Sequence, residues 1–561
     1  MLNFIIGRNN SGKTEKIRAL IAERASENKK CILIVPEQFS FESERSILEK
    51  IGAQKMLNVD ILSFTRLAFV INEQYGKALN KTIDDGTRKV LMSLSLEALS
   101  GKLEYFKRFS SKPALLSNLL TFVTELKQCA VTPDEIAEIS GKTGNKSLGK
   151  KLSELSLIAA SYDALVSRSF FDDENLLTIA ADMISETDFF DGKAVYFDAF
   201  CGFTKQERNC IKSILPKAEN VFISLCTDRD LSREGVSVFE NVNSEFSHLK
   251  KCAAEQNVGV SSPEILNVKE DGRSPELVYL EKYLCGEESE PYKEECDNIV
   301  VCAAGNRADE ADFVACEIKK LLRCNPTLRC RNIAVIERTA GTYDKELSES
   351  FKKYGVPMFE DKRRPIGIQP VMVFVKCLLA LCAEGFSTES FMRLLKTGLT
   401  ALSGDEISEL ENYAFLWNID GSKWRRDFTE NPDGLGFDVT EKSQEKLIRL
   451  NDIRKRSVLP VLAFKKDFEE ADGEKKSRLI YEFLIKNGIT ERLREKIEYL
   501  VSSGDTVLCE EQDTVWATLM DMLGKMASAI GETVITAKRY SELFNILLSA
   551  VTLGCRRSLT A

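Results

Sequence analysis

Short apolar runs alternate with amphipathic stretches from the start of this chain. Residues 2–6, 31–35 and 59–62 are predominantly apolar, as strands buried on both faces of a parallel sheet are. After the first run, Ile17 and Ile21 belong to a set of apolar positions that recur at helical spacing. Strands that alternate with helices in this way predict an α/β layer fold.

The strand pattern is absent between residues 79 and 191, where apolar positions recur with helical periodicity. The expected helices in this stretch are residues 87–99, 115–129, 133–139 and 148–167. We therefore predict a helical insertion at residues 79–191, within an α/β domain formed by residues 1–78 and 192–262.

The sheet pattern resumes after the insertion. Residues 194–198 form an apolar run that ends in Asp198, residues 204–215 predict a helix, and residues 221–225 predict another buried strand. Residues 263–297 contain repeated glycine, proline and acidic residues, which predicts a linker.

A second group of alternating elements follows the linker. The expected strands are residues 299–302, 333–336 and 356–359, and the expected helices are residues 307–322 and 343–354. From about residue 387 the pattern is helical almost to the end. We expect residues 298–386 to be part of a second α/β domain and residues 387–561 to be a second helical insertion.

The composition is that of an ordinary globular protein. Of the 561 residues, 43% are hydrophobic and 29% are charged, and several domains are expected at this length. The net charge of −9 argues against sequence-independent coating of nucleic acid, but it is compatible with a local basic groove or a basic partner. The longest apolar window, residues 371–381, is too short to span a membrane and contains Lys376, so we expect a cytoplasmic protein.

Cysteine and histidine usage narrows the possible chemistry. The 16 cysteines are scattered and form no Cys-x-x-Cys pair, which favours reduced thiols over a metal site. The single histidine, His248, lies in a polar helical stretch, and we expect it at the surface. Most histidine-based catalysis and histidine-rich zinc sites are therefore excluded.

Residues 7–14 match the pattern G-x-x-x-x-G-K-[ST] at every fixed position. An apolar run precedes the segment and a helical pattern follows it, which is the context of a phosphate-binding loop. Backbone N–H groups would face the phosphates, Lys13 would reach the β- and γ-phosphates, and Thr14 would hold Mg²⁺. The alternative is a glycine-rich turn without a ligand. The predicted nucleotide-binding residues of this loop are Gly7, Arg8, Asn9, Asn10, Ser11, Gly12, Lys13 and Thr14.

Asp198 lies at the predicted carboxyl end of a strand near this loop. NTPases hold the Mg²⁺ shell with a carboxylate at such a position, so we predict a metal role for Asp198 together with Thr14. The alternative is an aspartate that only begins a loop.

The residue after Asp198 is Ala199, which can neither accept a proton nor orient water. We therefore expect nucleotide binding with slow or absent hydrolysis, and we assign no catalytic residue.

Four further polar residues were considered around this site. Thr204 and Glu207 have the spacing of a helix capping box, which we favour over a catalytic role for Glu207. Gln206 is a candidate sensor of the phosphates. Arg338, which follows the expected strand at residues 333–336, could contact the γ-phosphate from the second domain or could be an ordinary surface arginine.

Two α/β units in tandem, each with a helical insertion, are typical of a superfamily 1 helicase motor. Several segments, in chain order, resemble the AddB family, which pairs with AddA in bacterial AddAB helicase–nucleases of the Firmicutes type. These segments are Val-Pro-Glu-Gln-Phe at 35–39, Ser-Phe-Thr-Arg-Leu-Ala at 63–68, Phe-Asp-Ala-Phe at 197–200 with Phe-Thr at 203–204, and Tyr-Gly-Val-Pro at 354–357 with Asp-Lys-Arg-Arg at 361–364. The resemblance covers essentially the whole chain.

The resemblance implies tandem RecA-like, UvrD-like domains in a degenerate motor. AddB proteins pair with AddA, the active motor, and process double-stranded DNA ends for recombinational repair. Their helicase-like domains are thought to scan the strand for the Chi sequence. By position, Arg338 corresponds to the arginine of the fourth helicase motif. The implied contacts with single-stranded DNA are Glu37, Gln38, Phe39, Ser63 and Arg66.

Two departures from the family pattern affect these expectations. Too few residues precede Gly7 for the glutamine segment with which active relatives read adenine. The family's nuclease site, the late helicase motifs and the cysteine cluster of its expected iron–sulfur centre are not found in this chain. The segment at 553–561 is also untypical of the end of a packed domain, so we expect a truncated or frame-shifted reading of a longer protein.

The leading hypothesis is a nucleotide-binding, DNA-scanning component of a repair complex, with ATP and Mg²⁺ as ligands and an AddA-type partner. An autonomous ATP-driven translocase on single-stranded DNA is the alternative, and it requires a residue that orients water. A small-molecule P-loop kinase is a third possibility. The helical insertions and the second α/β unit argue against the kinase.

Overall fold

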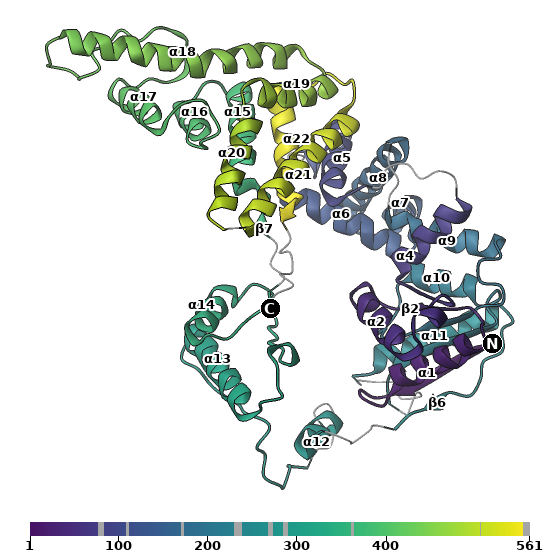
Figure 1. The fold of residues 1–561 in the computed structure, drawn as a ribbon. Helices are drawn as coiled ribbons and strands as arrows, with labels where there is room; N and C mark the ends of the chain where they lie inside the picture. Colours follow the sequence, from purple (N-terminus) through teal and green to yellow (C-terminus); the bar gives the residue numbers. More distant parts are fainter. Residues whose placement is uncertain are drawn as a thin grey trace. The chain divides into compact units, whose positions relative to one another are not determined.

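A computed structural model describes residues 1–76, 83–107, 112–169, 173–228, 238–267, 273–283, 290–360, 364–504 and 506–553. These residues fall into two compact units (Figure 1). The first unit contains the described residues from Met1 to Asn267, apart from Val238, together with those from Pro365 to Leu553. The second unit contains those between Arg273 and Arg364. The predicted motif at 361–363 and the segment from 554 onward lie outside the described residues.

A six-stranded parallel sheet forms the centre of the α/β part of the first unit, with the order β3-β2-β4-β5-β1-β6. Its strands are β1 (Leu2–Gly7), β2 (Cys31–Ile34), β3 (Val59–Leu62), β4 (Ala194–Phe197), β5 (Asn220–Cys226) and β6 (Glu264–Ile265). The strands predicted for residues 1–262 are confirmed. β6 was not predicted, because it lies inside the expected linker.

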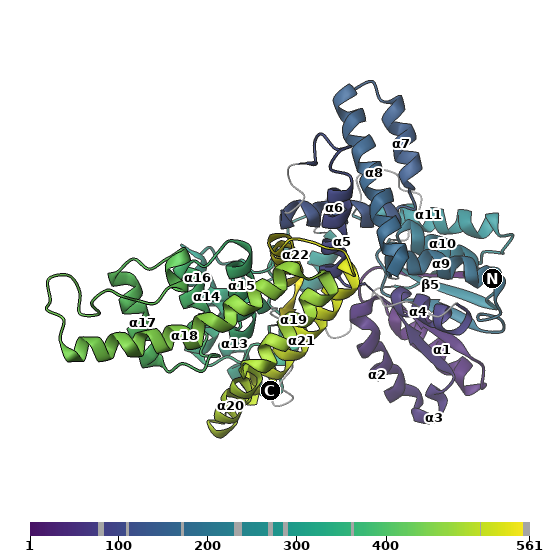
Figure 2. The same cartoon turned by 90° about the horizontal axis from the view of Figure 1, so that it is seen from above.

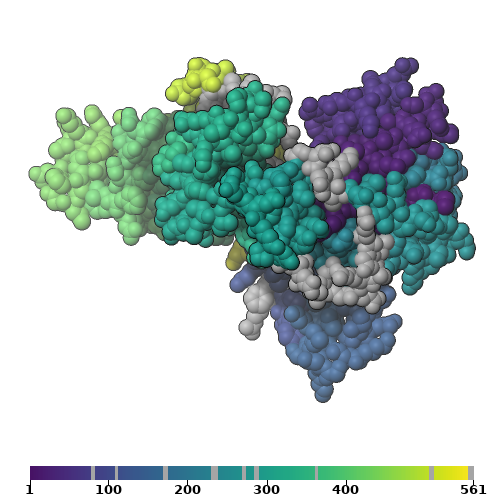
Figure 3. All heavy atoms as spheres, turned by 90° about the horizontal axis from the view of Figure 1, so that it is seen from below, coloured from purple at the N-terminus to yellow at the C-terminus, as the bar shows by residue number. Residues whose placement is uncertain are grey.

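Helices cover both faces of this sheet. They are α1 (Lys13–Ser26), α2 (Ser40–Ile51), α3 (Ala53–Met56), α4 (Phe64–Tyr75), α10 (Lys205–Ile214) and α11 (Glu240–Glu255), with the 3-10 turn η1 (Glu37–Phe39). Phe4 and Ile6 belong to one buried cluster and Ile5 to another, because successive side chains of a strand point to opposite faces. In Figure 3 the purple N-terminal residues share one surface with blue-green residues of the β5–β6 region, as expected from the pairing of β1 with both strands.

The predicted insertion between β3 and β4 is helical. It contains α5 (Asp85–Ala98), α6 (Pro113–Gln128), α7 (Pro133–Lys142), α8 (Lys146–Ser169) and α9 (Asp173–Glu186). Figure 2 shows α7 and α8 packed side by side, and α9 returns to pack on α4 and α10. The helical periodicity of residues 79–191 is therefore matched by helices in the described residues, while the bounds of the insertion as a domain stay a prediction.

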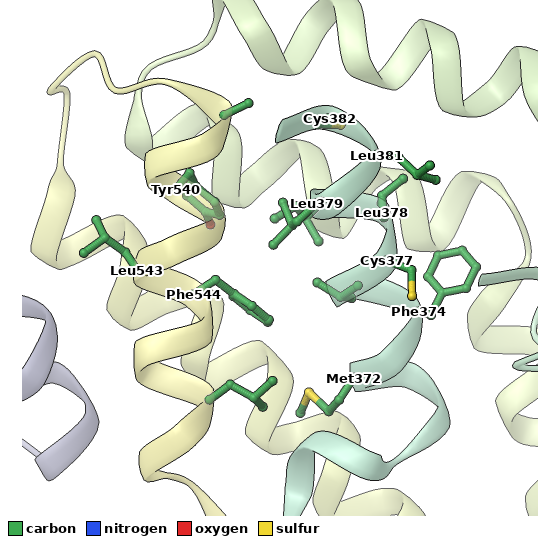
Figure 4. Close-up of a cluster of buried hydrophobic side chains, with 14 of the residues drawn as sticks. Met372, Phe374, Cys377, Leu378, Leu379, Leu381, Cys382, Tyr540, Leu543 and Phe544 are labelled. Atoms are coloured by element: carbon green, nitrogen blue, oxygen red, sulfur yellow. The ribbon is translucent and has the colours of Figure 1, made fainter. Parts of the chain in front are cut away.

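The C-terminal part of the first unit is also helical. Its elements are β7 (Arg364–Pro365), η4 (Ile366–Ile368), α15 (Pro370–Ala383), α16 (Thr388–Leu395), α17 (Gly404–Leu416), η5 (Gly421–Arg425), α18 (Glu441–Glu470), α19 (Gly473–Lys486), α20 (Ile489–Ser502), α21 (Thr506–Ile530), α22 (Ala537–Ala550) and β8 (Thr552–Leu553). Figure 4 shows Phe544 of α22 and Met372 of α15 among the buried side chains between these two helices. α15 therefore belongs to the helical part, although the sequence placed residues 370–383 in the second α/β domain.

The helical insertion and the C-terminal helices share one hydrophobic core. A Cβ placed on Gly86 of α5 would lie 2.4 Å from the Leu547 side chain of α22, so the two helices approach closely there. At the rim, Arg539 Nε donates to a Glu97 carboxylate oxygen at 2.9 Å, and Lys525 Nζ donates to Asp84 at 2.7 Å. Segments more than 400 residues apart in sequence are thereby joined in one unit.

The second unit is small and helical in its described residues. It contains α12 (Pro275–Tyr283), α13 (Arg307–Cys324), η3 (Cys330–Asn332) and α14 (Asp344–Tyr354). α13 and α14 pack around a core that includes Ala315, Ile318, Phe351 and Val356.

The strands predicted at 299–302, 333–336 and 356–359 are not observed in this unit, although all three segments lie within its described residues. An apolar run indicates that a segment can be buried, but a strand also needs a neighbour to pair its N–H and C=O groups. These described segments have no such neighbour, and the side chains of Val301 and Ile336 are 93% and 91% exposed. The predicted second sheet is therefore absent from the described part of the unit.

No described helix of the chain is both long enough and apolar enough to cross a bilayer.

Candidate nucleotide-binding site

The glycine loop connects β1 to α1 at the carboxyl edge of the sheet. Gly12 (φ 87°) and Asn10 (φ 58°) have left-handed backbone conformations, which glycine and asparagine adopt more readily than other residues. A Cβ at Gly7 would lie 2.3 Å from Ser11 Oγ and 2.9 Å from the carbonyl oxygen of Leu266. The position of Gly7 therefore accepts only glycine without rearrangement, and the loop closes tightly around the buried Ser11.

The side chain of Lys13 lies across this loop. Its Nζ donates to the carbonyl oxygens of Gly7 at 2.8 Å and Arg8 at 2.7 Å, and it lies 3.4 Å from Ser11 Oγ. An anionic phosphate oxygen would compete well for these donors, because a charged acceptor binds an ammonium more strongly than a neutral carbonyl does. The half-buried Thr14 follows in the first turn of α1, where backbone N–H groups have no intrahelical partner. The loop thus offers groups that a polyphosphate needs, and the roles of Lys13 on the phosphates and of Thr14 on Mg²⁺ stay predictions.

Three contacts around the loop were not predicted. The guanidinium of Arg8 lies 5.4 Å from the ring centroid of Phe239, which directly precedes α11. Lys16 pairs with Glu264 of β6 at 2.7 Å, and the Leu266 N–H donates to a carbonyl of β1 at 2.8 Å. β6 thus runs directly beside the strand that carries the loop. A strand of two residues is too short to give a recognisable pattern.

Asp198 is buried at the carboxyl end of β4, and its Oδ1 accepts a hydrogen bond of 2.5 Å from Ser224 Oγ. Ser224 belongs to β5, which lies between β4 and β1 in the sheet. Because these strands are parallel, Asp198 and the glycine loop lie at the same edge, with one strand between them. In the sequence, Ser224 is a lone serine among the apolar residues of β5. This pattern could have indicated its polar contact, but the contact was not predicted.

Ala199 follows Asp198 with a φ of 65°, in the left-handed region. This conformation costs about 1 kcal/mol for a residue that has a Cβ, whereas glycine adopts it freely. The turn therefore leads away from Asp198 through a strained alanine whose methyl group offers no proton acceptor.

Substitution Ala199→Gly is expected to raise the free energy of unfolding by about 0.5 kcal/mol, since relief of strain exceeds the entropy that glycine adds to the unfolded chain. Urea denaturation followed by circular dichroism measures this difference. The control Ala22→Gly, inside α1, should instead lower the free energy of unfolding by about 1 kcal/mol. Equal destabilisation by both changes would contradict the proposed strain.

The capping box at Thr204 and Glu207 is confirmed. Thr204 Oγ1 accepts from the Glu207 N–H at 3.2 Å, and Glu207 accepts from the Thr204 N–H at 2.7 Å. Gln206 is buried, and its Nε2 donates to Thr178 Oγ1 of α9 at 2.9 Å. The amide of Gln206 therefore helps to join α10 to α9, and its role as a sensor of the phosphates stays a prediction.

A buried acid lies behind the turn that follows Asp198. Glu245 of α11 is 6% exposed, accepts from the Phe203 N–H at 3.5 Å, and pairs with Arg208 at 3.5 Å. Burial raises the pKa of the Glu245 carboxyl, and the nearby Arg208 charge opposes that increase. Glu245 was not predicted, and its contacts indicate that it positions this turn.

The predicted DNA-contacting residues lie together after β2 and β3. Glu37 accepts from Ser63 Oγ at 2.7 Å, and Ser63 Oγ in turn accepts from the Arg66 N–H at 3.1 Å, which caps α4. Gln38, Phe39 and the Arg66 side chain are exposed. Because β2 and β3 are adjacent and parallel, these residues share the carboxyl edge of the sheet with the glycine loop.

Arg338 belongs to the second unit and is exposed. The preceding Glu337 organises its surroundings by accepting from the N–H groups of Gly341 at 2.5 Å and Tyr343 at 3.0 Å. The contact of Arg338 with a nucleotide on the first unit stays a prediction.

The described residues contain no group of three or more His, Cys, Asp or Glu side chains that could hold a metal ion. Mg²⁺ is commonly bound through one or two protein ligands together with phosphate oxygens and waters. Thr14 and Asp198 carry oxygen atoms suited to that mode, and their role as Mg²⁺ ligands stays a prediction. The cysteines of the described segments are free thiols, and Cys31, Cys377 and Cys382 are buried.

Comparison with known proteins gives consistent matches. The family model described as "ADDB, N-terminal" matches residues 4–281. Relatives named as the B subunit of an "ATP-dependent helicase/deoxyribonuclease" come from Acetivibrio thermocellus (29% identity, 97% of this chain, 48% of the relative), Clostridium acetobutylicum (29%, 97%, 48%) and Clostridioides difficile (28%, 99%, 49%). The chain thus spans about half the length of the curated relatives that it matches.

These matches agree with the resemblance drawn from the separate motifs. The family model covers the strands, the glycine loop and the helical insertion described above, and the relatives extend the similarity through the C-terminal helices. The chain belongs to the AddB family.

Proposed function

We propose that this chain binds ATP with Mg²⁺ and is the helicase-like, DNA-scanning part of a heterodimeric helicase/nuclease. Its relatives are named for an "ATP-dependent helicase/deoxyribonuclease", which supports this family role. In this proposal an AddA-type protein is the partner, the substrate is single- and double-stranded DNA at a double-strand break, and the complex acts in the cytoplasm. Scanning would include recognition of the Chi sequence.

The observation that carries the proposal is the arrangement at the carboxyl edge of the sheet. Lys13 and Thr14 follow β1, and Asp198 follows β4 with Ser224 Oγ holding one carboxylate oxygen. A phosphate chain with its Mg²⁺ needs an ammonium, backbone N–H groups, a hydroxyl and a carboxylate in this kind of layout. When bound, the ion would neutralise phosphate charge, while Lys13 would orient the phosphates.

The same edge supports a DNA strand beside the nucleotide. Gln38, Phe39 and Arg66 are exposed there and offer an amide, an aromatic face and a cation, which are the groups that contact bases and phosphates. Glu37 and Ser63 would position them through the hydrogen bond that joins the two loops. In this proposal Arg338, which belongs to the second unit, would contact the γ-phosphate.

Slow turnover is part of the proposal. The residue after Asp198 would have to accept a proton or orient water for efficient hydrolysis, and Ala199 has no group that can do either. Nucleotide binding would then act on conformation, while the active motor lies on the partner.

The test compares binding and hydrolysis for the 561-residue chain. A fluorescent ATP analogue with Mg²⁺ is expected to bind saturably, and ATP turnover is expected to stay far below about 1 s⁻¹, the lower end of typical enzyme rates. Added single-stranded DNA should not bring turnover into the typical range. Fast, DNA-stimulated hydrolysis would instead support an autonomous translocase, and no binding at all would refute nucleotide binding by this chain.

A further inference from the structure

A cavity of about 460 Å³ lies over β3 in the first unit. Lys30 and Lys193 line it from positions directly before β2 and β4, so it opens near the amino ends of these parallel strands. Asp60 and Leu62 line it from β3, and Tyr75 lines it from the end of α4. The glycine loop follows the carboxyl end of β1, so the cavity and the loop belong to opposite edges of the sheet.

Two ammonium groups meet at this cavity without a paired carboxylate. Neither the Lys30 nor the Lys193 ammonium forms a hydrogen bond or an ion pair with another side chain in the part of the chain that the structure describes. Lys193 Nζ instead lies 4.0 Å from the centroid of the Phe189 ring. Burial lowers the pKa of Lys193, the Asp60 charge opposes that decrease, and the Lys30 charge adds to it, so the two cations repel each other. A bound anion would remove that repulsion.

The carboxylates at the cavity are arranged differently. Asp188 accepts a hydrogen bond of 2.8 Å from Tyr75 OH, which in turn accepts from Gln74 Nε2 at 3.3 Å. Asp60 is exposed on β3 and has no hydrogen-bond or ion-pair partner among the described side chains. The Asp188 carboxylate thus accepts a hydrogen bond from a tyrosine, and the Asp60 carboxylate can accept hydrogen bonds from hydroxyl or amino groups of a ligand.

Part of the cavity lining is apolar. Leu62, Val70 and Phe189 contribute it, next to the two ammonium groups and the Asp60 carboxylate. The volume lies in the range of small-molecule sites, which typically combine apolar walls with a few polar groups that fix orientation. The matching ligand has an anionic end, hydroxyl donors and an apolar ring.

We propose that this cavity binds a small organic phosphate of the nucleoside monophosphate class. The phosphate lies between Lys30 and Lys193, a sugar hydroxyl donates to Asp60, and the base covers Leu62 and Val70. Lysine ammonium groups bind phosphate as point charges, and an acidic side chain commonly accepts from ribose hydroxyls. The site is independent of the nucleotide proposed for the glycine loop.

The test measures the binding of AMP by calorimetry. The protein carries Lys13→Ala, so that binding at the glycine loop does not contribute to the signal. AMP is expected to bind there, inorganic phosphate more weakly, and adenosine at least 10-fold more weakly than AMP. Lys30→Ala and Lys193→Gln should each weaken AMP binding at least 10-fold. The control Lys29→Ala, which removes an exposed lysine paired with Glu27, should leave the affinity unchanged.

A second measurement does not depend on the stability of a Lys193 variant. Pyridoxal phosphate condenses with a neutral lysine amine, releases water and leaves an imine that borohydride reduces to a stable amine. Labelling, located by mass spectrometry, is expected first at Lys193, and AMP should protect it. The proposal is overturned if AMP does not bind, if Lys30→Ala and Lys193→Gln bind AMP like the parent, or if AMP fails to protect Lys193. Binding only of a longer 5′-phosphorylated oligonucleotide would also overturn it, in favour of a nucleic-acid end.

Discussion

Substitution Lys13→Ala is expected to weaken binding of MgATP by about 100-fold, which corresponds to about 2.7 kcal/mol. The lysine supplies charge-assisted hydrogen bonds, each worth about 1.5–3 kcal/mol, and alanine supplies none. In the unliganded protein its Nζ contacts carbonyl oxygens and a hydroxyl of the loop, which water can hydrate after the change. Affinity measured by titration with a fluorescent ATP analogue should fall, while the thermal unfolding midpoint stays nearly constant.

The control for this experiment is Lys29→Ala, which removes the same charge from the exposed pair with Glu27. It should change neither nucleotide affinity nor stability measurably, because exposed ion pairs contribute little. Lys13→Arg should bind weakly too, since a guanidinium does not fit the space of an ammonium between the Gly7 and Arg8 carbonyls. Unchanged affinity in Lys13→Ala would show that the loop does not hold the phosphates.

Substitution Trp424→Ala is expected to lower the free energy of unfolding by about 3–5 kcal/mol. The indole is fully buried, its ring centroid lies 4.9 Å from that of Phe391 and 5.9 Å from that of Phe428, and its Nε1 donates to Thr388 Oγ1 at 2.8 Å. Alanine would leave a large cavity and would remove this donor from the threonine hydroxyl. Urea denaturation followed by far-ultraviolet circular dichroism measures the loss.

Two matched variants separate the contributions of this tryptophan. Trp424→Phe keeps an aromatic ring but removes the hydrogen bond to Thr388, so a smaller loss of about 1–2 kcal/mol is expected. Phe415→Ala removes an aromatic ring that is 71% exposed on α17, and it should change stability by less than about 0.5 kcal/mol. Similar losses in Trp424→Ala and Phe415→Ala would contradict the described packing.

The local features of the fold and the site could be predicted because their signals are short-range. Five strands of the sheet read as predominantly apolar segments of four or more residues, and the cap at Thr204 follows from spacing alone. The glycine loop likewise depends on consecutive residues, of which Gly7 and Gly12 are required by close approach and by positive φ.

The features that sequence reasoning missed depend on residues far apart in the chain. Ser224 contacts Asp198 because β5 lies between β4 and β1, and strand order is not encoded in any one strand. The hydrogen bond from Gln206 to Thr178 was not foreseen either, because no local pattern reveals how α9 packs against α10. The runs at 299–302 and 333–336 have the composition of strands, yet pairing partners decide whether a strand forms.

The joint core of α5 and α22 has a consequence for dissecting this protein. Residues 4–281 contain the entire match to the family model and keep α6 and α8, but they lack α21 and α22, which also pack on α5. A fragment cut at that point would expose the part of α5 around Gly86 that lies against Leu547, together with an edge of the shared core, and would tend to aggregate. The smallest autonomous piece is therefore discontinuous in sequence, and a gene-level truncation would have to keep residues 365–553 attached.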